Sequence, residues 1–177
     1  IEELKGNLSA NGLTMPTGHV GFDMVRDQPD RVLEIAGALG MEAIFVPAVG
    51  PDERTKDAAG WRAFGEQLAA AGEAYWKAGL TFGWHNHAFE FENVYTDGTT
   101  FYDRLLAGTD PAVVKFELDA FWANRGGVDP VRILRDHVDR IGLVHIKDAQ
   151  RGDAAVDVPF GEGALDWEAI LGASEQA

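Results

Sequence analysis

Short apolar segments alternate with longer helical segments along this chain, and this alternation is the feature that most constrains its fold. The apolar segments begin roughly 28 to 38 residues apart, and a predicted helix separates each one from the next. This is the βα repeat of a parallel sheet. The predicted strands are residues 13–20, 42–49, 80–90, 113–121 and 141–148.

The predicted helices carry start and stop signals. Asp27 is a candidate N-cap with Pro29 in the first turn, and Gly40 is a C-terminal stop. Asp129 and Pro130 give a cap followed by proline at the first helical position. A loop with four turn-forming residues precedes the last helix: Gly152, Pro159, Gly161 and Gly163. The predicted helices are residues 1–10, 27–39, 54–78, 100–107, 129–138 and 166–173.

Two architectures share this pattern, the doubly wound open sheet and the (β/α)₈ TIM barrel. The open sheet usually carries a G-x-G-x-x-G turn, and this sequence has none. Polar residues instead follow the strand ends, as on the catalytic face of a barrel. A full barrel takes about 250 residues. We therefore expect an incomplete α/β barrel, with residues 1–177 forming a single partial domain that is truncated at both ends. The polar residues are His19, His85, His87, Glu117, Asp119, His145 and Lys147.

Composition excludes several classes of function. The chain has no Cys, which rules out disulfides, thiolate zinc sites and thiol nucleophiles. Its formal charge is −14 and it shows no basic cluster, which argues against nucleic-acid binding. No apolar run approaches the ~20 residues of a membrane helix. We predict a cytoplasmic protein with a small-molecule substrate, no nucleic-acid or membrane partner, and the possibility of a homo-oligomer.

The polar residues at the strand ends are spaced to converge. Residues two apart in a strand share a face, so these polar groups can meet in one cavity of a barrel. Histidine and carboxylate groups without cysteine suit Mn²⁺, Mg²⁺, Co²⁺ or Zn²⁺. Such an ion can polarise a carbonyl and stabilise an enediolate while a side chain moves a proton. The pairs that share a face are His85 with His87, Glu117 with Asp119, and His145 with Lys147.

Each of these residues also has a structural alternative. A histidine at a strand end is often simply hydrogen-bonded. Asp119 would be costly to bury without a partner, and Lys115 or Arg125 could pair with it. Lys147 could pair with Asp148 at the start of a loop.

Four motifs occur in order and together resemble the sugar phosphate isomerase/epimerase family, which is part of the xylose-isomerase-like TIM barrel superfamily. They are GWHNHAFEFE (residues 83–92), FELDAFWANRGGVDP (116–130), IGLVHIKD (141–148) and FGEGALDW (160–167). A fifth segment, TGHVGFD (17–23), is similar to the third strand of that family. The resemblance covers nearly the whole chain. It implies that strands three to seven of the barrel are present.

The resemblance also implies a divalent-metal site. It matches the acid of strand six to Asp119 and the histidine of strand seven to His145. The strand-five position, a glutamate in many members, is His85 here, and Glu90 is a rival candidate for that place. A last glutamate ligand would lie beyond Ala177.

Further roles follow from the same motifs. His87, Glu90 and Lys147 are candidates to move protons, while His19, Trp122 and Glu162 are candidates to contact the substrate. The implied activity is a metal-dependent isomerase or epimerase that acts on a sugar, sugar phosphate or keto-sugar. Alternatives are an enzyme similar to inosose dehydratases or 3-keto-glycoside lyases, an apurinic-site endonuclease, which the acidic charge disfavours, and an inactive barrel fragment.

Overall fold

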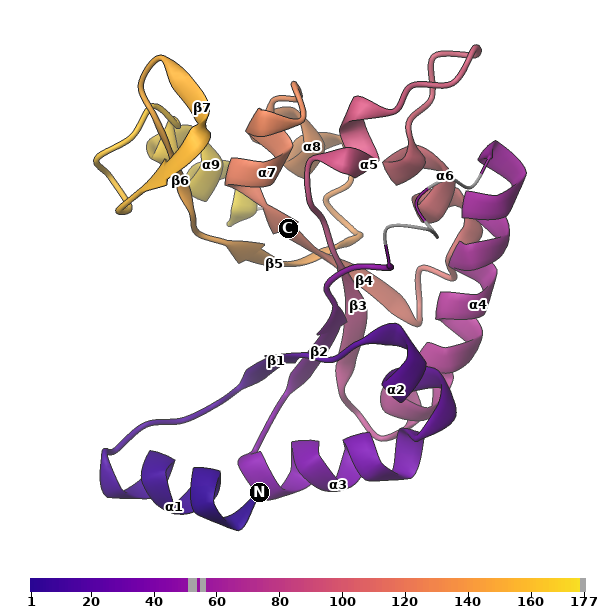
Figure 1. Cartoon of the computed structure of the whole chain (residues 1–177), viewed down its shortest axis with the longest axis vertical. Helices are drawn as coiled ribbons and strands as arrows, with labels where there is room; N and C mark the ends of the chain where they lie inside the picture. The colour runs from indigo at the N-terminus through magenta and orange to yellow at the C-terminus, as the bar shows by residue number, and fades with distance from the viewer. Residues whose placement is uncertain (51–53, 55–56, 176–177) are drawn as a thin grey trace.

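Five parallel strands form one sheet whose spatial order follows the chain, as the computed structural model of residues 1–50, 54 and 57–175 shows (Figure 1). Each strand pairs with the next in sequence, from Thr17↔Ala43 at one edge to Asp119↔His145 at the other. Together with the helices between the strands, this arrangement is part of a TIM barrel, as predicted. The strands are β1 (Thr17–His19), β2 (Ala43–Val46), β3 (Thr81–His85), β4 (Val114–Asp119) and β5 (Ile141–His145).

The helices connect these strands and cover the sheet. The longest helix, α4, packs against β3 and α6, while α5 and α7 lie beyond the carboxyl ends of β3 and β4 (Figure 1). Among the described residues, no helix has the length and apolar character needed to cross a membrane. The helices are α1 (Glu2–Ala10), α2 (Phe22–Asp27), α3 (Pro29–Leu39), α4 (Ala58–Lys77), α5 (Phe89–Glu92), α6 (Phe101–Gly108), α7 (Ala120–Arg125), α8 (Pro130–Asp136) and α9 (Trp167–Ser174).

A large part of the core lies between the sheet and α4. All four residues of β2 are buried, as expected for a parallel strand covered on both faces. Buried residues recur on one face of α4 at helical spacing, namely Trp61, Phe64, Leu68 and Tyr75. Trp61 stacks on Phe101 of α6, and Tyr75 stacks on Phe82 of β3. These contacts fix the sheet that carries the strand ends.

Several local predictions are confirmed and one is wrong. Gly40 ends α3 in the left-handed conformation (φ 71°), and Asp129 caps α8. Asp27 is not the N-cap of α3, because it ends a separate helix, α2, where Arg26 binds its carboxylate at 2.7 Å. In the predicted helix 54–78, residues 55 and 56 lie outside the described part of the chain.

The predicted strands are longer than the observed ones because several carboxyl ends run into a following helix or turn. The strand predicted to reach residue 90 ends at His85, and Glu90 lies in α5. The strand predicted to reach residue 121 ends at Asp119, which caps α7. The strand predicted to reach residue 148 ends at His145.

A hairpin replaces part of the loop predicted after β5. Its antiparallel strands are β6 (Asp148–Gln150) and β7 (Asp153–Val158). The buried carboxylate of Asp148 accepts hydrogen bonds from the backbone N–H groups of Gly161, Gly163 and Leu165. Asp148 therefore fastens the following loop to the base of the hairpin.

Candidate functional site

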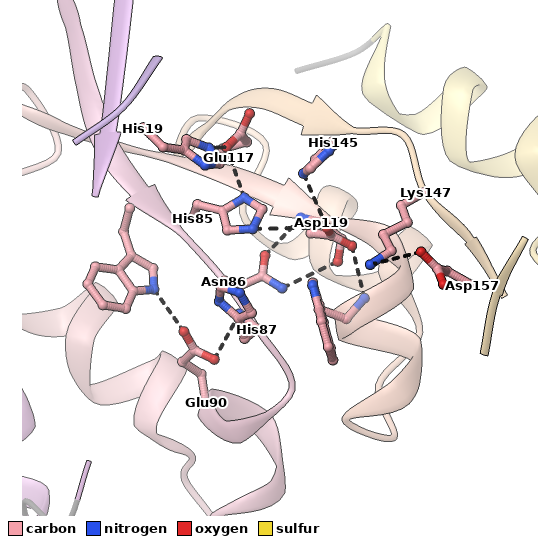
Figure 2. A network of polar contacts seen from close by, with 12 residues as sticks. His19, His85, Asn86, His87, Glu90, Glu117, Asp119, His145, Lys147 and Asp157 are labelled. Carbon is pink, nitrogen blue, oxygen red and sulfur yellow. Dashed lines mark hydrogen bonds and ion pairs between the residues drawn. The ribbon is translucent and has the colours of Figure 1, made fainter. Parts of the chain in front are cut away.

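Three side chains meet at the carboxyl ends of adjacent strands (Figure 2). His85 ends β3, Asp119 ends β4 and His145 ends β5. Asp119 and His145 are direct cross-strand partners, and His85 pairs with Glu117 two residues before Asp119. Because the strands are parallel, their ends lie on one side of the sheet. The convergence of these three residues that the sequence predicted is therefore observed.

The spacing of their polar atoms suits a metal ion. Oδ2 of Asp119 is 3.2 Å from Nδ1 of His145 and 4.0 Å from Nε2 of His85. The three ligand atoms lie within 4.8 Å of one another. Metal–ligand bonds of about 2.1 Å place neighbouring ligand atoms about 3 to 4 Å apart. The donor set, two imidazoles and one carboxylate, also suits a divalent ion.

Asp119 is held so that one carboxylate oxygen stays available. Its Oδ1 accepts a hydrogen bond from the backbone N–H of Trp122 at 2.9 Å. Its own backbone N–H donates to Oδ1 of Asn86 at 2.9 Å, and the Asn86 amide donates back to the Asp119 carbonyl. Oδ2 is buried and accepts no hydrogen bond from any residue that the structure describes. A buried carboxylate oxygen is stabilised by a positive partner, which protonated His145 at 3.2 Å or a bound cation would provide, so the site fits a metal.

The structural alternatives for Asp119 and Lys147 are not what the structure shows. Lys115 donates to the backbone carbonyl of Asp139, and Arg125 lies over the Trp122 ring. Nζ of Lys147 is 3.4 Å from the Asp157 carboxylate in β7.

Glu117, to which the sequence analysis gave no role, joins a second cluster beside the first. Its Oε2 is 2.9 Å from Nδ1 of His85 and 2.5 Å from Nε2 of His19. Burial raises the pKa of this carboxyl, but hydrogen bonds from the two histidines outweigh burial and lower it to about 2. Oε2 of Glu117 already accepts hydrogen bonds from both histidines, whereas Oδ2 of Asp119, which lies within ion-pair distance of His145, accepts no hydrogen bond from the described residues. We therefore place the candidate metal at His85, Asp119 and His145.

Three candidate residues surround the triad on the side of α7. The His87 ring lies 5.1 Å from the His85 ring and 5.2 Å from the Trp122 ring. Nζ of Lys147 lies 4.8 Å from the centre of the Trp122 ring and 4.4 Å from that of Phe121. Trp122 thus contacts both His87 and Lys147.

The titration of two histidines is shifted in opposite directions. The Asp119 carboxylate raises the pKa of His145. Burial lowers the pKa of His87 to about 4, and the neighbouring His85 adds to this effect. Nδ1 of His87 is buried and has no hydrogen-bond partner among the described residues. At neutral pH the His87 ring is therefore neutral.

Glu90 and Glu162 lie in different surroundings. Glu90 is fully buried, and its two oxygens accept hydrogen bonds from Nε1 of Trp84 and the backbone N–H of His87. This position suits a residue that holds the β3–α5 loop beneath His87, and proton transfer by Glu90 stays a prediction. Glu162 is exposed on the loop that Asp148 fastens, and its contact with a substrate also stays a prediction.

The burial of Glu90 predicts a pH-dependent stability. Burial raises the pKa of this carboxyl from 4.5 to about 8, so the folded chain holds a proton that the unfolded chain loses above about pH 4.5. The contribution of Glu90 to the free energy of unfolding is greatest below about pH 4.5. It falls by about 1.4 kcal/mol per pH unit between that value and about pH 8. Urea unfolding of the metal-free chain at several pH values measures this slope. In Glu90→Gln the slope should flatten. An unchanged slope would show that Glu90 is ionised in the folded chain.

Comparison with known proteins gives three kinds of match. The family described as Xylose isomerase-like TIM barrel matches residues 1–175. An inosose dehydratase from Bacillus licheniformis is 38% identical over 90 residues, which are 51% of this chain and 29% of that protein. An inosose dehydratase from Geobacillus kaustophilus is 29% identical over 119 residues, which are 67% of this chain and 37% of that protein. The matches thus span well under half the length of these relatives.

The structural match covers almost the whole chain. A crystal structure of a sugar phosphate isomerase/epimerase from Parabacteroides distasonis superimposes with a TM-score of 0.81 and 25% identity. The match covers 99% of this chain and 64% of the other.

Proposed function

The chain belongs to the xylose isomerase-like TIM barrel family, and on that premise we propose that it carries the metal-binding part of an enzyme that moves a proton beside the carbonyl of a sugar or keto-sugar. The observation that carries this proposal is the buried Oδ2 of Asp119, which accepts no hydrogen bond from the described residues and lies near two imidazole nitrogens. His85, Asp119 and His145 would hold Mn²⁺, Mg²⁺, Co²⁺ or Zn²⁺.

A bound divalent ion would polarise the substrate carbonyl and stabilise the enediolate. We propose His87 as the group that accepts the proton, because its ring is neutral at neutral pH and lies beside His85 and Trp122. The Lys147 ammonium, held over Trp122, can donate a hydrogen bond to a substrate oxygen. The Trp122 ring offers an apolar surface for the sugar, while His19 and Glu162 stand as further substrate contacts.

Two outcomes share this first step. In an isomerase or epimerase, the proton returns to a different carbon or to the opposite face of the same carbon. In a dehydratase, the neighbouring carbon loses its hydroxyl group as water. The fold match to an isomerase/epimerase supports the first outcome, and the similarity to two inosose dehydratases supports the second. The −14 charge remains the argument against the apurinic-site endonuclease.

Solvent deuterium exchange tests the shared step without knowledge of the product. The chain is loaded with Mn²⁺ or Zn²⁺ in D₂O and given a ketohexose, its phosphate or an inosose, and ¹H NMR follows the signal beside the carbonyl. We expect this signal to be lost with at least one substrate. Mass spectrometry then separates an isomer from a product that has lost water. Absence of both exchange and product with every substrate would contradict the proposed activity for this chain and favour the inactive fragment.

A further inference from the structure

One oxygen of Glu117 contacts histidines from two strands that are not neighbours in the sheet (Figure 2). We infer that Glu117 is a positioning residue that fixes His85 and His19 in opposite tautomers, so that the Nε2 lone pair of His85 is available beside Asp119. This inference rests on the proposed metal site for its consequence. The tautomers themselves can be tested without a metal.

The tautomers follow from the hydrogen-bonding capacity of the groups. An ionised carboxylate oxygen accepts hydrogen bonds but donates none. The 2.9 Å contact with Nδ1 of His85 therefore requires a proton on Nδ1. A neutral imidazole carries one N–H, so Nε2 of His85 keeps its lone pair. His19 contacts the same oxygen through Nε2, which places its proton there and leaves the lone pair on Nδ1.

The tautomer of His85 matters because its two ring nitrogens have different surroundings. Nδ1 contacts Glu117, whereas Nε2 is 4.0 Å from Oδ2 of Asp119. A metal ligand must offer a lone pair. If the proton were on Nε2 instead, His85 would present an N–H to the candidate metal position and could not bind an ion there.

The surroundings make this arrangement rigid. The His85 side chain is 4% exposed and that of Glu117 is 11% exposed, so water competes little for their hydrogen bond. His85 and Glu117 are direct cross-strand partners in β3 and β4. The same carboxylate also reaches His19 at the end of β1, whose ring lies 4.7 Å from that of His85. A carboxylate behind a ligating histidine is a common way to fix its ring and its tautomer.

NMR of the metal-free chain with ¹⁵N-labelled histidine tests the tautomers directly. At about pH 8 an unperturbed imidazole is neutral, and long-range ¹H–¹⁵N correlations identify the protonated nitrogen. We expect Nδ1–H in His85 and Nε2–H in His19. In Glu117→Ala, His85 should lose its preference for Nδ1–H. A wild-type His85 protonated at Nε2, or a Glu117→Ala chain with unchanged tautomers, would overturn the inference.

Calorimetric titration with Mn²⁺ and with Zn²⁺ provides the second measurement. Loss of the carboxylate in Glu117→Ala should weaken binding about 10- to 100-fold. Glu117→Gln keeps an oxygen acceptor and should lose less, which also guards against a variant that fails to fold. Glu168→Gln, an exposed position in α9, is the matched control and should bind as the wild type does.

The two measurements separate the inference from the proposed function. A wild-type chain with the expected tautomers but no metal affinity would contradict the proposed metal site and leave the assignment of Glu117 intact. A wild-type chain that binds metal with an affinity unaffected by Glu117→Ala would overturn the positioning role instead.

Discussion

Asp119→Asn should lower the affinity for Mn²⁺ or Zn²⁺ by more than about 100-fold, because it alters a proposed ligand itself. Substitution of a residue that only hydrogen-bonds a ligand typically lowers metal affinity 10- to 100-fold. With Oδ1 still bound to the Trp122 N–H, the substitution puts an N–H₂ group in place of the buried Oδ2, facing the two histidines. Deuterium exchange into the substrate should be lost with the metal. Calorimetry and elemental analysis of the purified chain measure the effect.

The fold should survive this change. An asparagine can still accept the hydrogen bond that Trp122 donates to Oδ1, and Asn is as good an N-cap as Asp. Asp129→Asn is the matched control, since Asp129 also caps a helix, α8, through the Val131 N–H. That variant should bind metal normally. Equal metal content in Asp119→Asn and the wild-type chain would refute the assigned ligand set.

Gly83→Ala should destabilise the chain by about 3 kcal/mol or more, at or above the upper end for an overpacked core. A Cβ atom at Gly83 would lie 2.1 Å from the backbone oxygen of Lys115 in β4 and 2.7 Å from the Phe45 ring in β2. The first contact is with backbone in a paired strand, so the sheet itself would have to move. Urea unfolding measures the loss.

A glycine in a helix gives the comparison for Gly83. At Gly37 in α3, an added Cβ meets nothing within 4 Å. Gly37→Ala should therefore be neutral or stabilise the chain by up to about 1 kcal/mol, as alanine is the better helix former. Because Gly83 is two residues from His85, Gly83→Ala should also weaken metal binding. Similar unfolding midpoints for both variants would show that the β3–β4 spacing tolerates a methyl group.

The sequence predicted the sheet and the candidate ligands because their signals are local or periodic. The apolar segments identified all five parallel strands, and the cap at Asp129 and the stop at Gly40 were correct. Residues at the ends of parallel strands lie on one side of the sheet by geometry, so His85, Asp119 and His145 could be grouped without coordinates. Their function as ligands stays a prediction.

The predictions failed where a distant or competing partner decides the outcome. Asp27 has the residue type of an N-cap, but Arg26 binds its carboxylate and α2 ends there. Glu90 follows an apolar segment in the sequence, yet it lies in α5 and not in the strand. Its carboxylate there accepts a hydrogen bond from the His87 backbone N–H. For Lys147 the sequence left a structural alternative open, a pair with the neighbouring Asp148, and the structure pairs it with Asp157 across the hairpin.

The sequence by itself therefore determined the half-barrel and the edge of the sheet where its polar residues gather, since periodicity and capping depend on residues within a few positions. Only the tertiary structure decided which of these polar residues hydrogen-bond to one another. Glu117 contacts His19 across 98 positions of the chain, and no local pattern encodes such a distance. It also decided that Oδ2 of Asp119 faces the two histidines, while Trp122 binds Oδ1 and Asn86 binds the Asp119 backbone.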